Sequence, residues 1–247
     1  MTRRERQGVG MRRNGRNIKR EGIRRKEERA RGVELAKRLG IKGEKNLLKF
    51  CLDKQQKASA RGVACLALGF LGYKPAIPAL LELANDVDLA VVNGATRALE
   101  MMPSPRAVRP MMSLAREATR TEVRNRAIDV LGMLGDNRAE ETLVSILGNH
   151  AEAESTRCCA AAAMAGLGPP SDSAMACLLD ALREPSALLR WTVLNTLGIV
   201  GNQNTIPSIK ACLADQETVP HLPSKETVAS AAENALRNLK VCAQPTS

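Results

Sequence analysis

A pattern of apolar residues recurs along most of this sequence at intervals of 31 to 33 residues. In each copy one apolar residue ends the first helical stripe, and these residues are Leu68, Leu99, Leu131, Met164, Leu197 and Leu236. The last interval is longer, at 39 residues, and a weaker copy is centred on Leu39. A unit of this length can form one helical hairpin but cannot bury its apolar face alone, so the copies are expected to stack on one another.

Other residue types keep the same register relative to these six positions. Four residues before them stand apolar side chains, mostly alanine: Ala64, Ala95, Ala127, Ala160, Val193 and Ala232. Four residues after four of them stands glycine: Gly72, Gly135, Gly168 and Gly201. Alanine lets neighbouring helices approach closely, and glycine is expected to end the first helix of each copy in the left-handed conformation.

Arginine is also repeated, seven residues before four of the six positions: Arg61, Arg124, Arg157 and Arg190. A cation at one place in successive units can bind an acidic residue or a helix C-terminal carbonyl of the neighbouring unit. Residues 85–88, "NDVD", offer suitable acids. We therefore interpret these arginines as structural.

A second apolar cluster follows in each copy, about twelve to fifteen residues after the first position. Prolines lie at or near the expected starts of these second segments: Pro75, Pro78, Pro105, Pro110, Pro170 and Pro207. Proline is tolerated in the first turn of a helix because the N–H groups there have no intrahelical partner. Each copy is thus predicted to be a helix, a turn and a second helix.

The combined pattern, "VRxxAxxxLGxLG…AxxxLxxxL", is clear in "EVRNRAIDVLGMLGDNRAEETLVSIL" and "LLRWTVLNTLGIVGNQNTIPSIKACL". It resembles HEAT repeats, particularly the short HEAT-like form named after phycobilisome lyases, which belongs to the armadillo-type superhelices. The resemblance implies an all-α fold, a right-handed α-solenoid of about six HEAT-like helical hairpins. It does not imply one function, because this repeat hosts many activities.

The repeat also sets the expected domain limits. We expect the solenoid to cover residues 30–240, with a degenerate first copy at 30–56. Residues 1–29 are a basic extension that is expected to be disordered or helical, and residues 241–247 are a C-terminal tail.

Sequence signatures of an enzyme are missing. Diiron hydroxylases built on HEAT repeats use His-Glu pairs, whereas here His150 precedes Ala151 and His221 precedes Leu222. The seven cysteines form no CxxC pair, which favours reduced thiols packed as small apolar residues in a cytoplasmic protein. No window approaches the ~18 apolar residues of a membrane span. We therefore predict no metal, no cofactor and no catalytic residue, although a bilin-lyase-like or other modifying enzyme subunit remains an alternative.

One stretch departs from the repeat by carrying a stripe of arginines. Arg106, Arg109, Arg116 and Arg120 follow one another at intervals of three, seven and four residues, which predicts one face of a second helix. Arg138 stands at the equivalent position of the next copy and would extend the stripe. Two interpretations stay open: a solvated polar face, or a docking patch for an acidic partner segment or phosphates.

Trp191 is the only tryptophan, and the other copies carry Gly, Asn, Cys or Ser at its position. A position that accepts Asn and Ser is not deep core, so a partly exposed tryptophan is expected there. Such a residue is often an interface anchor. The alternative is packing against the adjacent repeat.

Positive charge is concentrated at the N-terminus. Residues 1–60 contain 20 Lys/Arg and 7 Asp/Glu, whereas residues 61–247 contain 17 and 19. The candidate residues for polyanion binding in this segment are Arg12, Arg13, Arg24 and Arg25. A solvated tail, binding to nucleic acid or a ribosomal surface, and attachment to an anionic membrane all stay open.

The leading hypothesis is a non-enzymatic adaptor or scaffold that binds a protein partner through the repeat surface. The alternative is a nucleic-acid- or ribosome-associated factor that uses the basic segment and the arginine stripe. The oligomeric state is not predicted.

Overall fold

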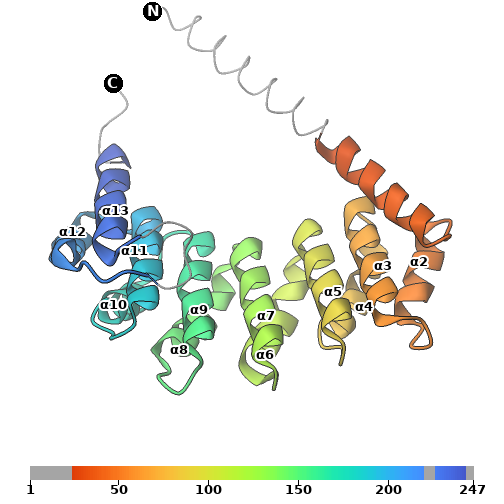
Figure 1. The fold of residues 1–247 in the computed structure, drawn as a ribbon, viewed down its shortest axis with the longest axis horizontal. Helices are drawn as coiled ribbons and strands as arrows, with labels where there is room; N and C mark the ends of the chain where they lie inside the picture. Colours follow the sequence, from red (N-terminus) through yellow and green to blue (C-terminus); the bar gives the residue numbers. More distant parts are fainter. Residues whose placement is uncertain (1–23, 220–225, 243–247) are drawn as a thin grey trace, which may run out of the picture. The chain divides into compact units, whose positions relative to one another are not determined.

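The structure, a computed structural model, describes residues 24–219 and 226–242. The chain divides after Met102 into two compact units. In the described residues the secondary structure is helical, apart from one isolated β-bridge between Thr218 and Thr227 (Figure 1). The predicted all-α solenoid of HEAT-like hairpins is therefore confirmed.

The first unit begins with a helix over residues 24–38, which forms a hairpin with α2 (Glu44–Leu52). The next elements are α3 (Ala58–Leu71), the 3₁₀ turn η1 (Lys74–Ala76), α4 (Ile77–Leu83) and α5 (Leu89–Met101). Helix α3 packs against α2 and against α5. The first helix crosses the boundary expected at residue 30, and the predicted domain limits stay a prediction.

The second unit repeats the hairpin with alternating first and second helices. The second helices, with their preceding 3₁₀ turns, are η2 (Pro105–Ala107) with α6 (Val108–Glu117), η3 (Asn137–Ala139) with α8 (Glu140–Gly148), α10 (Asp172–Ala181), and η4 (Gln203–Thr205) with α12 (Ile206–Ala211). The first helices are α7 (Thr121–Leu134), α9 (Glu154–Leu167), α11 (Ala187–Val200) and α13 (Val228–Cys242). A short 3₁₀ turn, η5 (Cys212–Ala214), follows α12. Helices α7, α9, α11 and α13 pack against one another in turn and form a continuous layer.

The repeated apolar positions form the core, as the sequence predicted. Leu68, Leu99, Leu131, Met164 and Leu197 are almost completely buried, and so are all six side chains four residues before the repeated positions. The sixth position, Leu236, is only half-buried, because the core of α13 is built from Ala232, Ala235 and Leu239. The register of this last helix is therefore shifted relative to the others.

The glycines that follow the first helices do not all act in the same way. Gly72 and Gly135 adopt the predicted left-handed conformation, with φ of 66° and 63°. Gly201 does not, since its φ is −68°. A Cβ atom on Gly201 would lie 2.3 Å from the backbone oxygen of Leu197, so glycine is required there by close approach rather than by a positive φ.

Most second helices start with a 3₁₀ turn, which the sequence did not predict. The side chains of Ser104, Asp136 and Asn202 each accept a hydrogen bond from the backbone N–H two residues later. These contacts satisfy donors that a helix start leaves free, and the predicted prolines lie at or near the same starts.

Two sequence predictions concern other parts of the chain. Arg12 and Arg13 lie outside the described residues. Among the helices that the structure describes, none is long and apolar enough to cross a membrane.

Candidate functional site

The repeated arginines hold consecutive hairpins together. Arg157 on α9 donates from Nε to the backbone oxygen of Leu147 at 2.8 Å, and its Nη2 pairs with Glu184 at 2.9 Å. Leu147 lies near the end of the preceding second helix, and Glu184 follows the next one. Arg61 repeats this arrangement in the first unit, with the backbone oxygen of Cys51 and the carboxylate of Asp86, each at 2.8 Å. The structural interpretation is thus confirmed, including the predicted acid in residues 85–88.

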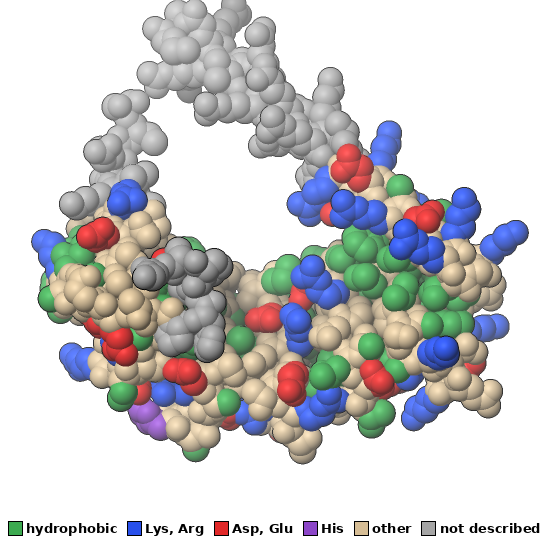
Figure 2. Space-filling view, in the orientation of Figure 1, with side chains coloured by type: hydrophobic (Ala, Val, Ile, Leu, Met, Phe, Trp, Pro, Cys, Tyr) green, Lys and Arg blue, Asp and Glu red, His purple; other side chains and the backbone are tan. Residues whose placement is uncertain are grey.

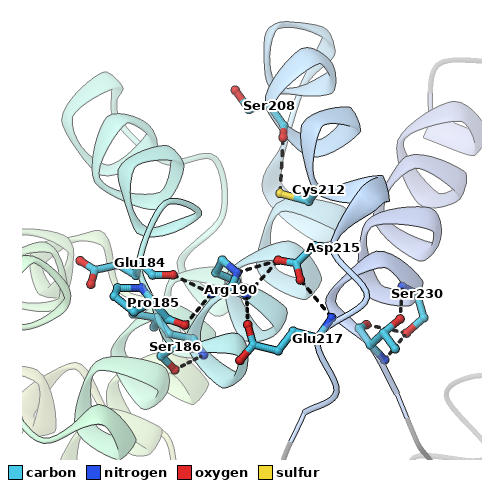
Figure 3. Close-up of polar contacts among 11 residues, drawn as sticks. Glu184, Pro185, Ser186, Arg190, Ser208, Cys212, Asp215, Glu217 and Ser230 are labelled. Atoms are coloured by element: carbon cyan, nitrogen blue, oxygen red, sulfur yellow. Dashed lines mark hydrogen bonds and ion pairs between the residues drawn. The ribbon is translucent and has the colours of Figure 1, made fainter.

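Arg190 is the most completely bound of these side chains (Figure 3). Its Nη1 donates to the backbone oxygens of Glu184 and Pro185, both at 2.7 Å. Its Nε donates to Asp215 at 2.9 Å, and its Nη2 pairs with Glu217 at 2.7 Å. The loop after α10, the residue that follows η5 and the loop before α13 are therefore joined by one guanidinium group.

The Arg190 network also borders an open hollow of about 610 Å³ between α10 and α12. Its apolar floor includes Leu179 and Leu182, and its polar wall is formed by Arg190, Asp215 and Glu217. These polar groups bind one another, since Arg190 pairs with both Asp215 and Glu217.

Two of the acids that pair with the repeated arginines, Asp86 and Glu184, have lowered pKa values. The hydrogen bond from Arg157 lowers the pKa of Glu184, against a smaller opposing effect of burial. For Asp86, burial raises the pKa, but the N–H of Asp88 and the guanidinium of Arg61 together lower it below the usual value. Both carboxylates therefore act as permanent anions of the scaffold at neutral pH.

Five of the described cysteines have raised pKa values. The six whose side chains are described are free thiols: Cys51, Cys65, Cys158, Cys159, Cys177 and Cys212. Burial raises the pKa of Cys158, Cys177 and Cys212, and that of Cys159 to about 12. A hydrogen bond with Cys51 and burial raise the pKa of Cys65. Thiols that stay protonated are poor nucleophiles and poor metal ligands. Within the described ranges, no group of three or more His, Cys, Asp or Glu side chains is placed so that it could hold a metal ion.

The predicted arginine stripe is only partly a helix face. Arg109 and Arg116 lie on α6, but α6 ends at Glu117, so Arg120 is instead the N-cap residue of α7. Arg106 precedes α6 in the 3₁₀ turn η2. The sequence spacing did not reveal that the chain leaves the helix at Ala118, whose backbone is extended.

Three of the five arginines bind other groups of the same chain. Arg116 donates to the hydroxyl of Thr142 on α8, and Arg120 also has a partner. Arg138 forms two hydrogen bonds with Asp136, at 2.9 and 2.7 Å, and contacts the backbone oxygen of Pro105 at 3.4 Å. The hydrogen bonds that Asp136 accepts from the side chain and the backbone N–H of Arg138 lower the pKa of Asp136 to about 2. Arg138 thus approaches the stripe, but its charge is neutralised.

The two remaining arginines, Arg106 and Arg109, form what we call the open arginine pair. Both side chains are exposed. Neither guanidinium binds any side chain or carbonyl in the part of the chain that the structure describes. Both lie where α6 begins, close to the neutralised Arg138. They are the strongest candidates for contact with an anionic partner in this unit.

Trp191 is half-buried and bound within the chain. Its indole Nε1 donates to the carboxylate of Glu226 at 2.9 Å, and Glu226 belongs to the loop that precedes α13. Trp191 therefore joins two consecutive repeats, which supports packing against the adjacent repeat over an interface anchor.

In the N-terminal segment, Arg24 is exposed and pairs with Glu28 at 3.1 Å, and Arg25 also has a partner. The lysines that follow make no such contacts. Lys42, Lys45 and Lys49 are exposed on and just before α2, at intervals that a helical pattern could have revealed. These three lysines were not among the predicted site residues.

The family model for HEAT repeats matches residues 45–132 and 140–220. No curated protein matches the sequence significantly. A designed armadillo repeat protein solved in complex with peptide (KR)4 is 14% identical with a TM-score of 0.53, over 78% of this chain and 98% of that one. This likeness concerns the fold.

Two natural proteins are less similar in structure. The complex of CpcE and CpcF of phycocyanin lyase from a Nostoc species is 21% identical, with a TM-score of 0.48, over 92% of this chain and 84% of that one. Human deoxyhypusine hydroxylase is 17% identical, with a TM-score of 0.38, over 83% and 90%. Neither score is high enough to support an argument about activity.

The recurring hairpins, the buried register positions and the bridging arginines agree with the family match, which spans more than half of the sequence. The chain belongs to the HEAT-repeat family.

Proposed function

We propose that this protein is a non-enzymatic scaffold whose second unit binds an acidic segment of a protein partner. The observation that carries this proposal is the open arginine pair, Arg106 and Arg109. An exposed guanidinium without an internal partner keeps its full capacity to bind a carboxylate in a bidentate manner.

The position of the pair favours an anion. Arg106 and Arg109 lie at the N-terminal end of α6, where the helix dipole adds positive potential. The side chain of Ser104 caps the backbone N–H of Arg106 and thereby fixes the start of this element. A partner carboxylate would meet two cations on an ordered backbone, which reduces the entropy lost on binding.

The fold also supports a peptide as the partner. A designed armadillo repeat protein of similar fold was solved in complex with peptide (KR)4, so a repeat stack of this type can bind a charged peptide. In the present chain the sign of the charge is reversed, because the open groups are cations. The free thiols fit a cytoplasmic location, where disulfides are rare.

The nucleic-acid alternative finds little support at this surface. Arg116, Arg120 and Arg138 are engaged by the protein itself, so the stripe offers fewer free cations than its sequence suggests. No observation on the described residues favours a bilin-lyase-like activity over a binding role.

Affinity capture after nuclease treatment tests the proposal. The full chain is expected to retain a protein partner, Arg106→Lys/Arg109→Lys to bind it more weakly because lysine cannot pair with a carboxylate in a bidentate manner, and Arg106→Glu/Arg109→Glu to lose it. A synthetic acidic peptide of about twelve residues should follow the same order in a fluorescence anisotropy titration, with a loss of at least about tenfold. Equal binding by all three proteins would remove the open arginine pair from the proposal.

A further inference from the structure

The first unit carries a second cationic surface that is independent of the proposed protein-binding role. Residues 24–57 contain 12 Lys/Arg and 5 Asp/Glu. Figure 2 shows Lys and Arg side chains gathered around the N-terminal helices of this unit. Only charges without an intramolecular partner are free to bind another molecule.

Internal ion pairs use arginines rather than lysines. Arg24 pairs with Glu28, Arg38 with Glu34, and Arg29 with Glu44, at distances of 3.1, 3.4 and 3.5 Å. The remaining acids are Asp53 and Glu27. Asp53 accepts hydrogen bonds from Gln55 and Gln56. Four of the five acids are therefore occupied, and they leave most of the lysine charge unneutralised.

Three exposed lysines on and just before α2 form what we call the lysine surface. Lys42, Lys45 and Lys49 follow at intervals of three and four residues, and their ammonium groups bind no other group within the described residues. The opposite side of α2 is fixed in the core by Leu47 and Cys51. Lys45 and Lys49 are consequently held outward by the packing of α2.

The lysine surface borders a shallow hollow. Lys42 and Lys49 line it together with Asn46, Phe50 and Asp53, and its volume is about 520 Å³. Lys42 and Lys49 therefore face the same space, although Lys42 precedes the helix. A single half-buried ring, that of Phe50, is available there, which is too little for a series of stacked bases.

We infer that the lysine surface binds the sugar-phosphate backbone of a nucleic acid duplex without reading its sequence. Lys45 and Lys49 lie one turn apart on α2, about 6 Å along the helix axis, which is close to twice the spacing of phosphates on one strand of B-DNA. Lys42 lines the same hollow as Lys49, so three ammonium groups are available to phosphates at this surface, and binding releases condensed counterions.

A membrane surface fits the same residues less well. Stable attachment of a surface helix needs a continuous apolar face that enters the lipid. The apolar side of α2 is used in the core, and the large apolar side chain left exposed on this helix is Leu52 alone, at 44%. An isolated residue of this kind is ordinary on a soluble surface.

The inference is tested on the full chain with a fluorescein-labelled DNA duplex of about 20 base pairs, followed by anisotropy at several NaCl concentrations. Lys42→Glu/Lys45→Glu/Lys49→Glu should weaken binding at least about tenfold, and the slope of log K against log salt should fall by about 2.7, or about 0.9 per lost phosphate contact. Lys42→Arg/Lys45→Arg/Lys49→Arg should bind as the parent does.

A charge-matched variant distinguishes an effect of the lysine surface on DNA binding from an effect of net charge. Lys74, Lys210 and Arg237 are exposed and lie outside the lysine surface, so Lys74→Glu/Lys210→Glu/Arg237→Glu makes the same change in charge. This control should change affinity by less than about twofold. An equal loss in the control, an unchanged salt slope in the lysine variant, or binding of the parent only to phosphatidylserine vesicles would each overturn the inference.

Thermal unfolding identifies any variant that fails to fold. Because all three lysines are exposed, the glutamate variant is expected to unfold at the temperature of the parent. If it does not, Lys42→Gln/Lys45→Gln/Lys49→Gln replaces it and must lower the salt slope by the same about 2.7. The open arginine variants, tested with the same duplex, should bind it as the parent does, which keeps this inference distinguishable from the proposed function.

Discussion

Gly166 on α9 faces the backbone of Gly132 on α7 so closely that a Cβ atom on Gly166 would lie 2.0 Å from the Gly132 carbonyl oxygen. The first unit has the same arrangement, since a Cβ atom on Gly94 would lie 2.2 Å from the carbonyl oxygen of Gly62. Neighbouring first helices thus touch backbone to backbone, which only glycine permits at these positions.

We expect Gly166→Ala to destabilise the second unit by about 2–3 kcal/mol, because the added methyl group must push α7 and α9 apart. Trp191 is the only tryptophan and lies in the second unit, so guanidinium unfolding followed by its fluorescence reports on that unit. Gly148→Ala on α8 is the matched control, since the nearest neighbour of its Cβ would be Cys177 Sγ at 3.8 Å. That control should be neutral or stabilise by up to about 1 kcal/mol. Similar losses in both variants would contradict the steric explanation.

Arg157→Met should lower the free energy of unfolding by about 3 kcal/mol, because it leaves the Leu147 carbonyl unpaired and Glu184 without its cation. The exposed pair of Arg183 and Asp180 supplies the comparison. Arg183→Met should cost less than about 1 kcal/mol, since exposed ion pairs contribute little. Both losses are measured by denaturant titration. An equal loss of unfolding free energy in the two variants would show that burial of the Arg157 bridge does not matter.

Stability should fall when the protein is acidified. The pKa of Glu184 is lowered from its usual 4.5, and that of Asp86 from its usual 3.8. Groups with lowered pKa values stabilise the fold above the unfolded values and lose this contribution as the pH falls through the folded ones. The melting temperature should therefore decrease from about pH 5 downward. Glu184→Gln should flatten this decrease, and an unchanged pH profile in that variant would exclude Glu184 as a contributor.

Trp191→Phe keeps an aromatic ring but removes the hydrogen bond to Glu226. We expect a loss of about 1 kcal/mol in unfolding measured by circular dichroism, and little change in affinity for a captured partner. A loss of partner binding with unchanged stability would instead restore Trp191 as an interface anchor.

Much of the fold could be predicted from local patterns. The spacing of Leu68, Leu99 and Leu131 determined which faces are buried, because a hairpin of this length must bury its apolar stripe against a neighbour. The repeated arginines were recognised as structural for a similar reason: a cation that recurs with the repeat meets the same helix end in every copy.

The candidate sites were harder to predict, since sequence spacing does not show which charges are already used. Arg109 and Arg116 share a helix and a residue type, yet Arg116 binds Thr142 on the next hairpin and Arg109 binds no described residue. Likewise, Arg24 and Arg38 pair with nearby glutamates, whereas Lys42, Lys45 and Lys49 bind no described residue.

The sequence by itself determined the repeat, its helical hairpins and the core positions, because these follow from periodicity within a short stretch of chain. The tertiary structure decided which glycines meet, where the helices end and which cations remain free. Those outcomes depend on side chains about 25 to 35 residues apart that meet only when one hairpin packs on the next, and no local pattern specifies them.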